Sequence, residues 1–187
     1  MFGFCFTIVP FVYMILQYGT SFNTVQTIPS WFYFTYMVCF FMYRILDEMD
    51  GKQARRTGNS SPLGMLFDHG CDAFTVGFIL MTTGKFLGFG DNLGTMMVVS
   101  GSVALFHYTT LEEYYVGGLF LGFMNPVTDL SILVYGLYAY LGFAGNTFFL
   151  KEIFKADDLW TGSPSMLSND IFKIVCYVVI FVQLCMW

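Results

Sequence analysis

Long apolar runs separated by short polar connections dominate the chain and set its expected architecture. Each run is close to the roughly 20 residues that a helix needs to cross a bilayer core. The runs are continuously apolar, whereas the strands of a membrane barrel alternate apolar and polar positions, so helices are favoured. We therefore predict an all-α polytopic membrane protein, a bundle of about six transmembrane helices at roughly residues 2–19, 31–46, 70–89, 93–110, 127–144 and 170–187.

The connections between these runs are short and carry the residues that end helices. Residues 20–30 contain an asparagine and a proline, and residues 84–92 are rich in glycine. Residues 145–169 mix charged and aromatic side chains, a pattern typical of an interfacial hairpin or short helix. No repeat and no soluble segment interrupts the pattern. We therefore expect one transmembrane domain over residues 1–187.

Composition supports lipid as the main solvent of this chain. Of its 187 residues, 56% are hydrophobic and only 11% are charged, and the mean hydropathy is +0.63. Soluble domains are about a quarter charged, so a chain this apolar could not cover a surface that faces water. The net charge of −5 and the lack of a basic stripe exclude nucleic acid as a partner. The five cysteines form no C-x-x-C pair and indicate neither a disulfide framework nor a zinc site.

Basic residues near the end of the second run indicate how the chain is oriented. Arg44, Lys52, Arg55 and Arg56 cluster there, within the distance at which the positive-inside rule has most weight. Four lysines on the opposite side equal this number, but they are spread along the chain. We therefore expect residues 47–64 to face the cytosol.

Two pairs of aspartates flank the connection between the second and third runs. Asp47 and Asp50 are three residues apart, and Asp68 and Asp72 are four apart, so each pair lies on one helix face. Two antiparallel helices joined by a short loop would bring the pairs opposite each other. Four carboxylates so close would repel one another unless a cation neutralised them. Hard oxygen ligands suit Mg²⁺ or Mn²⁺, and the two pairs leave room for two ions.

Small residues accompany these acids and strengthen the interpretation. Gly51, Ala54 and Gly64 would leave the metal-facing stripe open to a bulky phosphorylated ligand. Any single acid at a helix end could simply cap the helix or solvate a loop. The combined pattern D-x-x-D-G-x-x-A-R, eight residues, G-x-x-x-D-x-x-x-D is far more specific, with a chance match on the order of one in a hundred million. Its eight positions are Asp47, Asp50, Gly51, Ala54, Arg55, Gly64, Asp68 and Asp72.

This pattern resembles the signature of the CDP-alcohol phosphotransferase family. The segments DGKQARRTGNSSPLG (residues 50–64) and LFDHGCD (residues 66–72) are similar to its choline/ethanolamine phosphotransferase branch. The resemblance covers most of the chain and is sharp over residues 47–72. It implies an enzyme that transfers phosphoethanolamine or phosphocholine from CDP-ethanolamine or CDP-choline to diacylglycerol and releases CMP, in phospholipid synthesis.

The resemblance also implies a role for each residue of the pattern. The four aspartates would hold two divalent ions, Mg²⁺ or Mn²⁺, that grip the diphosphate. His69 resembles the general base of this branch, whose neutral imidazole takes the proton of the acceptor hydroxyl. The catalytic residues would then be His69 and Asp72, the metal ligands Asp47, Asp50, Asp68 and Asp72, and the substrate-binding residues Gly51, Ala54, Arg55 and Gly64.

Several other polar residues receive plainer interpretations. We expect His107 to have an interfacial or core role, Arg56 to anchor the helix at the membrane, and Glu112 and Glu113 to solvate a loop. Met65 marks a departure from the branch, which typically has a glutamate one turn before the histidine to orient or assist the base.

Three hypotheses from different classes stay open at this point. The leading one is the phosphotransferase. The second is a degenerate family member that serves as a structural or lipid-binding subunit of a larger membrane complex; Met65 and the shortened ends favour it, and the complete set of aspartates argues against it. The third is a cation transporter, which clustering of the acids at one membrane face argues against. Within the family, inositol or glycerophosphate acceptors are the runner-up chemistry.

The resemblance sets the remaining expectations. The chain should be truncated at both ends relative to the family. It should lie in the endoplasmic reticulum or a related endomembrane with its site facing the cytosol, although another organelle membrane stays open. A homodimer or a larger membrane complex would fit, and the sequence does not choose between choline and ethanolamine.

Overall fold

A computed structural model describes residues 2–22, 28–116, 128–146, 152–154, 166–167, 173–178 and 180–181 of the protein. Nearly all of these residues are helical, which confirms the all-α prediction. A small antiparallel pair of strands lies within residues 145–169, where an interfacial hairpin or short helix was expected. The elements are α1 (Phe2–Tyr18), α2 (Ser30–Thr57), α3 (Pro62–Leu87), α4 (Leu93–Val116), α5 (Thr128–Ala144), β1 (Glu152–Phe154) and β2 (Met166–Leu167).

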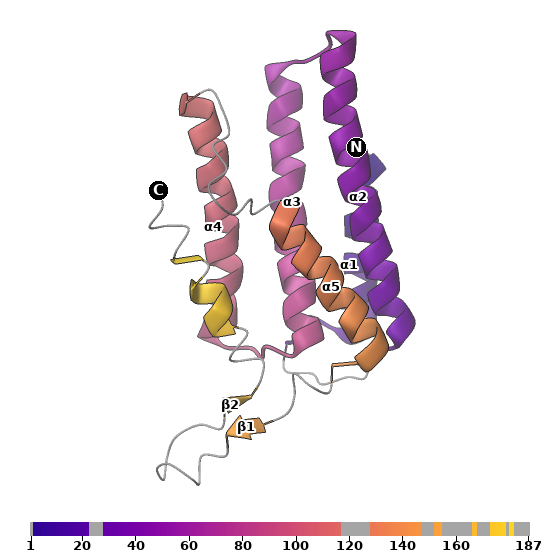
Figure 1. Cartoon of the computed structure of the whole chain (residues 1–187), viewed down its shortest axis with the longest axis vertical. Coiled ribbons are helices and arrows are strands. Elements are labelled where there is room, and N and C mark those ends of the chain that lie inside the picture. The colour runs from indigo at the N-terminus through magenta and orange to yellow at the C-terminus, as the bar shows by residue number, and fades with distance from the viewer. Residues whose placement is uncertain are drawn as a thin grey trace.

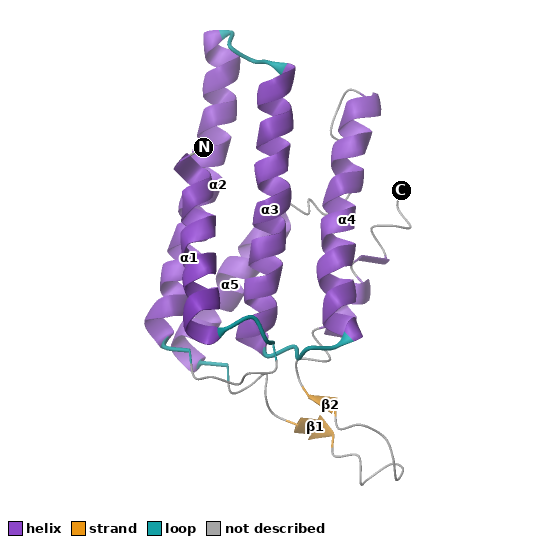
Figure 2. Cartoon of the chain, turned by 180° about the vertical axis from the view of Figure 1, so that it is seen from behind, coloured by secondary structure: helices purple, strands orange, loops and turns teal. Residues whose placement is uncertain are grey.

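The helices form a bundle in which α2 and α3 are central. In Figure 1, α2, α3 and α4 stand upright, while α5 runs obliquely from α3 to α2 and α1 lies behind. Helix α1 packs against both α2 and α3, α5 packs against α2, and α4 packs against α3. Figure 2 shows from behind that the ends of α2 and α3 nearest their connecting loop extend beyond α1 and α5. The turn that joins α2 to α3 lies at these extended ends.

Local capping signals set the tight turn between α2 and α3. Helix α2 ends at Thr57, and Gly58 follows with a φ of 67°, a left-handed conformation that suits glycine. Helix α3 begins with Pro62, and the Ser61 hydroxyl accepts a hydrogen bond from the Gly64 amide at 3.0 Å. Four residues therefore reverse the chain direction, so the last turns of α2 lie antiparallel to the first turns of α3.

An aromatic core holds the opposite halves of these helices together. Tyr36 of α2, Phe86 of α3 and Tyr138 of α5 are buried, with ring centroids 5.5–5.8 Å apart in each pairing. Each such pair contributes about 0.5–1.5 kcal/mol beyond its buried area. The two tyrosine hydroxyls are also satisfied, because Tyr36 accepts from Thr82 and Tyr138 pairs with Thr83. This core lies away from the acidic residues and fixes how α2 and α3 are placed relative to each other.

The helices differ from the predicted spans mainly at their polar ends. Helix α2 continues to Thr57 instead of ending near residue 46, and α3 begins at Pro62 instead of residue 70. Charged side chains are compatible with a helix, so the loss of hydrophobicity does not end it. The boundaries are set by the caps: Gly58 ends α2, and Ser61 precedes the start of α3. The segment carrying the acidic pattern is therefore almost entirely helical.

The count of six spans stays a prediction. Within the described residues, α3 is the helix that is both long and apolar enough to cross a membrane, and α1 and residues 131–144 are shorter apolar helices. Of the predicted sixth span, residues 173–178 and 180–181 are described, and they are helical. Most of the predicted interfacial segment 145–169, and the side chains of Glu112 and Glu113, lie outside the described residues.

A buried lysine ties α1 to the end of α3. Lys85 is 4% exposed, and its ammonium group donates hydrogen bonds to the main-chain carbonyl oxygens of Tyr18, Gly19 and Ser21. These carbonyl groups lie at and just after the end of α1, where no further helical amide is available to donate a hydrogen bond to them. One cation therefore satisfies three acceptors and fastens the start of the α1–α2 connection to α3.

We predict that Lys85→Met destabilises the protein, because the methionine cannot donate to the three carbonyl groups. The free energy of unfolding should fall by about 2–4 kcal/mol. Thermal unfolding of the purified protein in detergent measures this, with Lys52→Met as the matched control, since Lys52 is exposed and pairs with the exposed Glu48. Equal melting temperatures for the two variants would contradict the prediction.

Candidate metal centre

Three carboxylates meet where α2 and α3 face each other beyond the core. Asp47 and Asp50 of α2 and Asp68 of α3 each place a carboxylate oxygen within 4.8 Å of the other two. The spacing of three residues puts Asp47 and Asp50 on one face of α2, and the short turn after Gly58 places the start of α3 opposite that face. Oxygen ligands of one Mg²⁺ or Mn²⁺ ion lie at about 2.1 Å from the metal, so small adjustments of these side chains would let them share an ion. The donor set therefore fits a hard divalent cation.

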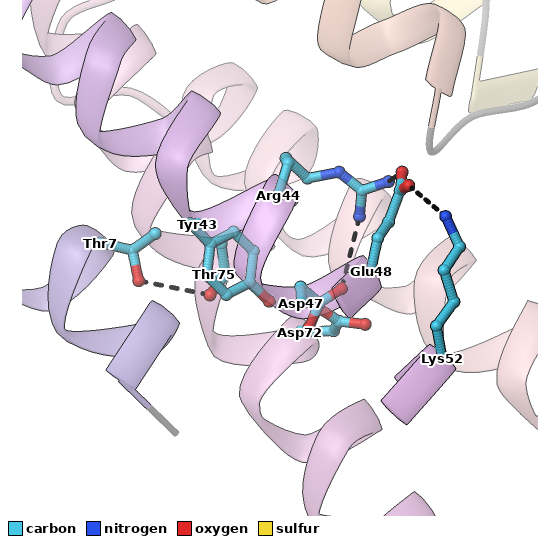
Figure 3. Close-up of polar contacts among 8 residues, drawn as sticks. All are labelled: Thr7, Tyr43, Arg44, Asp47, Glu48, Lys52, Asp72 and Thr75. Atoms are coloured by element: carbon cyan, nitrogen blue, oxygen red, sulfur yellow. Dashed lines mark hydrogen bonds and ion pairs between the residues drawn. The ribbon is translucent and has the colours of Figure 1, made fainter. Parts of the chain in front are cut away.

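The fourth aspartate lies at the edge of this group. Asp72 is one turn further along α3, and its carboxylate accepts a hydrogen bond from the hydroxyl of Tyr43 on α2. Figure 3 shows the carboxylates of Asp47 and Asp72 next to each other, with Tyr43 beside them. The structure thus gathers three of the four predicted ligands into one group and places the fourth beside it. That all four bind metal stays a prediction.

The acidic group carries more negative charge than its neighbours neutralise. Burial raises the pKa of Asp47 to about 7, and the charges of Asp72 and Asp68 add to the effect. Arg44 lies 3.7 Å from Asp47 and opposes this rise without cancelling it, because its guanidinium is also 3.8 Å from Glu48. A divalent cation would relieve this repulsion, which supports the proposed metal site.

The predicted substrate-binding residues lie on α2 and α3 beyond the acids. A Cβ atom at Gly51 would meet nothing nearer than the Arg55 guanidinium at 3.8 Å, so the surface here is open and Arg55 borders it. Ala54 lies one turn from Asp50, partly buried. Gly64 has a more local reason for its small size, because a Cβ atom there would lie 3.1 Å from the Ser61 hydroxyl that caps α3.

The predicted base lies on α3 between two of the aspartates in sequence. His69 is partly buried on α3 and interacts electrostatically with Asp68 and Asp72. Met65 lies one turn earlier on the same helix and is half exposed. The other histidine, His107, is exposed on α4, which excludes the core role considered for it and leaves the interfacial one.

Two residues that shape the group were not predicted from the sequence to belong to it. Tyr43 hydrogen-bonds Asp72, and Arg44 pairs with Asp47. A signal for both existed: Tyr43 is four residues before Asp47, and Arg44 is three residues before it, so both lie next to that aspartate on α2. Many helices carry such neighbours without a site, which is why the spacing alone did not reveal them.

Comparison with known proteins agrees with the sequence pattern. The family model described as CDP-alcohol phosphatidyltransferase matches residues 1–152. The chain is 39% identical over 123 residues to an uncharacterised class-I protein of that family from Schizosaccharomyces pombe, covering 66% of this chain and 32% of the relative. It is 32% identical over 152 residues to choline/ethanolaminephosphotransferase 1 of Arabidopsis thaliana, covering 81% of this chain and 39% of the relative.

A third relative is cholinephosphotransferase 1 of Saccharomyces cerevisiae, to which the chain is 36% identical over 132 residues. That alignment covers 70% of this chain and 33% of the relative. The chain therefore spans about a third of the length of the curated relatives that it matches.

We predict that divalent cations bind more weakly as the pH falls through about 7. Below that value Asp47 holds a proton in the metal-free protein, and the cation must displace it. The apparent Kd for Mn²⁺, measured by electron paramagnetic resonance of the free ion, should rise by up to about tenfold per pH unit between about pH 7 and pH 6.

Two variants control this measurement. Asp47→Asn should bind Mn²⁺ more weakly and with a flatter pH profile, because the titrating group is gone. Asp91→Asn removes an exposed carboxylate just after the opposite end of α3 and should keep the wild-type profile. An affinity that is independent of pH in the wild-type protein would contradict the prediction.

Proposed function

Because this chain belongs to the CDP-alcohol phosphatidyltransferase family, we propose that it is a phosphotransferase of phospholipid synthesis. It transfers phosphocholine or phosphoethanolamine from CDP-choline or CDP-ethanolamine to diacylglycerol and releases CMP. The names of two relatives, a choline/ethanolaminephosphotransferase and a cholinephosphotransferase, support this choice of substrates. The observation that carries the proposal is the convergence of Asp47, Asp50 and Asp68 beside an open, glycine-containing surface.

The aspartates bind the cofactor in this proposal. Asp47, Asp50, Asp68 and Asp72 hold two divalent ions, Mg²⁺ or Mn²⁺, which supply neutralising charge for the diphosphate and for CMP as it leaves. The excess negative charge around Asp47 supports cation binding here, since like charges this close are otherwise unfavourable. Gly51, Ala54 and Gly64 keep the adjoining surface open for the CDP-alcohol.

The chemical step needs a base and a partner for phosphate. His69 takes the proton from the diacylglycerol hydroxyl, whose oxygen then forms a bond to the phosphorus that carries the headgroup. The bond from this phosphorus to the bridging oxygen breaks, and CMP departs with that oxygen. Arg55, exposed next to Gly51, contacts a phosphate of the CDP-alcohol. The electrostatic interaction of His69 with Asp68 and Asp72 supports its place at the reacting centre.

The same proposal places the protein in a membrane. Large apolar side chains are exposed on the outward faces of several helices, among them Phe74 of α3, Met96 of α4 and Ile132 of α5. Lipid would cover these surfaces in an integral membrane protein with about six helices. We place it in the endoplasmic reticulum or a related endomembrane, with the acidic group facing the cytosol, and as a homodimer or part of a larger complex.

The second candidate, a family member with a structural or lipid-binding role, rests on Met65. The half-exposed methionine occupies the position from which a glutamate would assist His69. The third candidate, a cation transporter, is disfavoured because the acids cluster in the halves of α2 and α3 nearest their connecting turn.

Transfer of the labelled headgroup to diacylglycerol tests the proposed function. The purified chain in lipid nanodiscs, given CDP-choline or CDP-ethanolamine with Mg²⁺ or Mn²⁺, should form labelled phospholipid. Asp68→Ala and Asp72→Ala should each lower turnover by about 100-fold or more, whereas Glu48→Gln, an exposed acid outside the group, should retain it. Binding of the CDP-alcohol without any lipid product would favour the structural role.

His69→Ala separates proton transfer from binding. Loss of the base should lower kcat by about 100-fold or more while CDP-alcohol affinity stays within about twofold. His107→Ala is the matched control, because His107 is exposed on α4. An unchanged kcat in His69→Ala would remove His69 from the proposed mechanism.

A further inference from the structure

A cross-helix hydrogen bond connects α2 to the fourth aspartate of the acidic group. Tyr43 is 3% exposed on α2, and its hydroxyl donates to Oδ1 of Asp72 on α3. The close-up in Figure 3 shows Tyr43 and Asp72 together next to Asp47. A tyrosine hydroxyl has one proton to give, and here a carboxylate of the proposed metal group receives it.

Further hydroxyl groups support Tyr43 from behind. Thr75, one turn after Asp72 on α3, is also buried, and its side chain interacts with the same phenol. The Thr75 hydroxyl is in turn 3.4 Å from the hydroxyl of Thr7 on α1 (Figure 3). Hydroxyl groups from three helices therefore converge behind one carboxylate.

The chemistry of this contact suits a residue that orients a metal ligand. An aspartate side chain turns readily about its terminal torsion, and the charges near Asp72 favour its turning away from Asp47. A neutral donor holds the carboxylate without cancelling the negative charge that a cation requires, which a lysine or arginine in its place would do. With Oδ1 held by Tyr43, Oδ2 is the oxygen that stays available for a metal.

From these contacts we infer that Tyr43 is a positioning residue that fixes Asp72 for metal binding. The inference rests on the proposed metal site of this phosphotransferase. The aromatic ring alone does not account for the contact: Phe40 and Ile79 pack with Tyr43 in a buried cluster, and a phenylalanine would fill the same space. The distinctive element is the hydroxyl, and its partner is an acid of the metal group.

The test compares two tyrosines on the same helix. Tyr43→Phe removes the hydroxyl bound to Asp72, and Tyr33→Phe removes a buried hydroxyl that has no hydrogen-bond partner among the described residues. Mn²⁺ alone is the probe, and its binding to the detergent-purified protein is followed by electron paramagnetic resonance. Tyr43→Phe should raise the Kd by about tenfold, and Tyr33→Phe should leave it within about twofold.

A double-mutant cycle shows whether Tyr43 acts through Asp72. In an Asp72→Ala background, Tyr43→Phe should cause no further loss of Mn²⁺ affinity, because the group it positions is gone. A wild-type Kd for Tyr43→Phe, or the same tenfold loss in both backgrounds, overturns the inference. Should Tyr43→Phe not fold, Thr75→Val removes the support behind the phenol and must raise the Kd by less than tenfold but more than Tyr33→Phe does.

These measurements are independent of the transfer reaction. If Tyr43→Phe weakens Mn²⁺ binding but no lipid product forms with any variant, the positioning role stands and the proposed enzyme activity fails. If lipid product forms and Tyr43→Phe binds Mn²⁺ like the wild type, the activity stands and the positioning role fails.

Discussion

Mutual repulsion between carboxylates is the constraint around which this end of the molecule is organised. Asp47, Asp50 and Asp68 would move apart if their side chains were free, yet their oxygen atoms lie within 4.8 Å of one another. What holds them is elsewhere: the capped turn between α2 and α3 and the aromatic core at the far ends of the same helices. The protein thus uses apolar packing to maintain an unfavourable concentration of charge, a common arrangement where a cation completes the site.

The surroundings of the acids divide into two kinds of partner. Arg44 is a charged neighbour that competes with a cation for Asp47, whereas Tyr43 is a neutral neighbour that holds Asp72 and leaves its charge in place. Both come from consecutive positions of α2, so one helical turn both moderates the charge of the group and orients it. The same helix carries Gly51 and Ala54 further along, where the surface opens. Binding of metal and access of a ligand are therefore properties of successive turns of one helix.

The sequence predicted the helical fold and the meeting of acids because both depend on spacing. Continuous apolar runs indicate helices, and intervals of three and four residues place side chains on one face. Spacing does not fix side-chain torsions, so it could not foresee that Asp72 is engaged by Tyr43 while the other three acids gather. The apolar runs are shorter than the helices: α2 continues beyond residue 46 to Thr57, and α3 begins at Pro62, before residue 70. Charged residues are compatible with a helix, and the caps at Gly58 and Ser61 set the two boundaries. The role of Gly64 beside the Ser61 cap was likewise invisible without the turn geometry.

The lysine that satisfies the end of α1 has a consequence for the order in which the chain assembles. Tyr18 and Gly19 are synthesised 67 and 66 residues before Lys85. Their carbonyl groups therefore lack this hydrogen-bond donor while α2 and most of α3 are still being synthesised. During that interval these carbonyl groups need another hydrogen-bond donor, such as water. Arrival of the lysine then closes α1 onto α3, so the first helix reaches its final place only after the helix that carries Asp68 and Asp72 has been made.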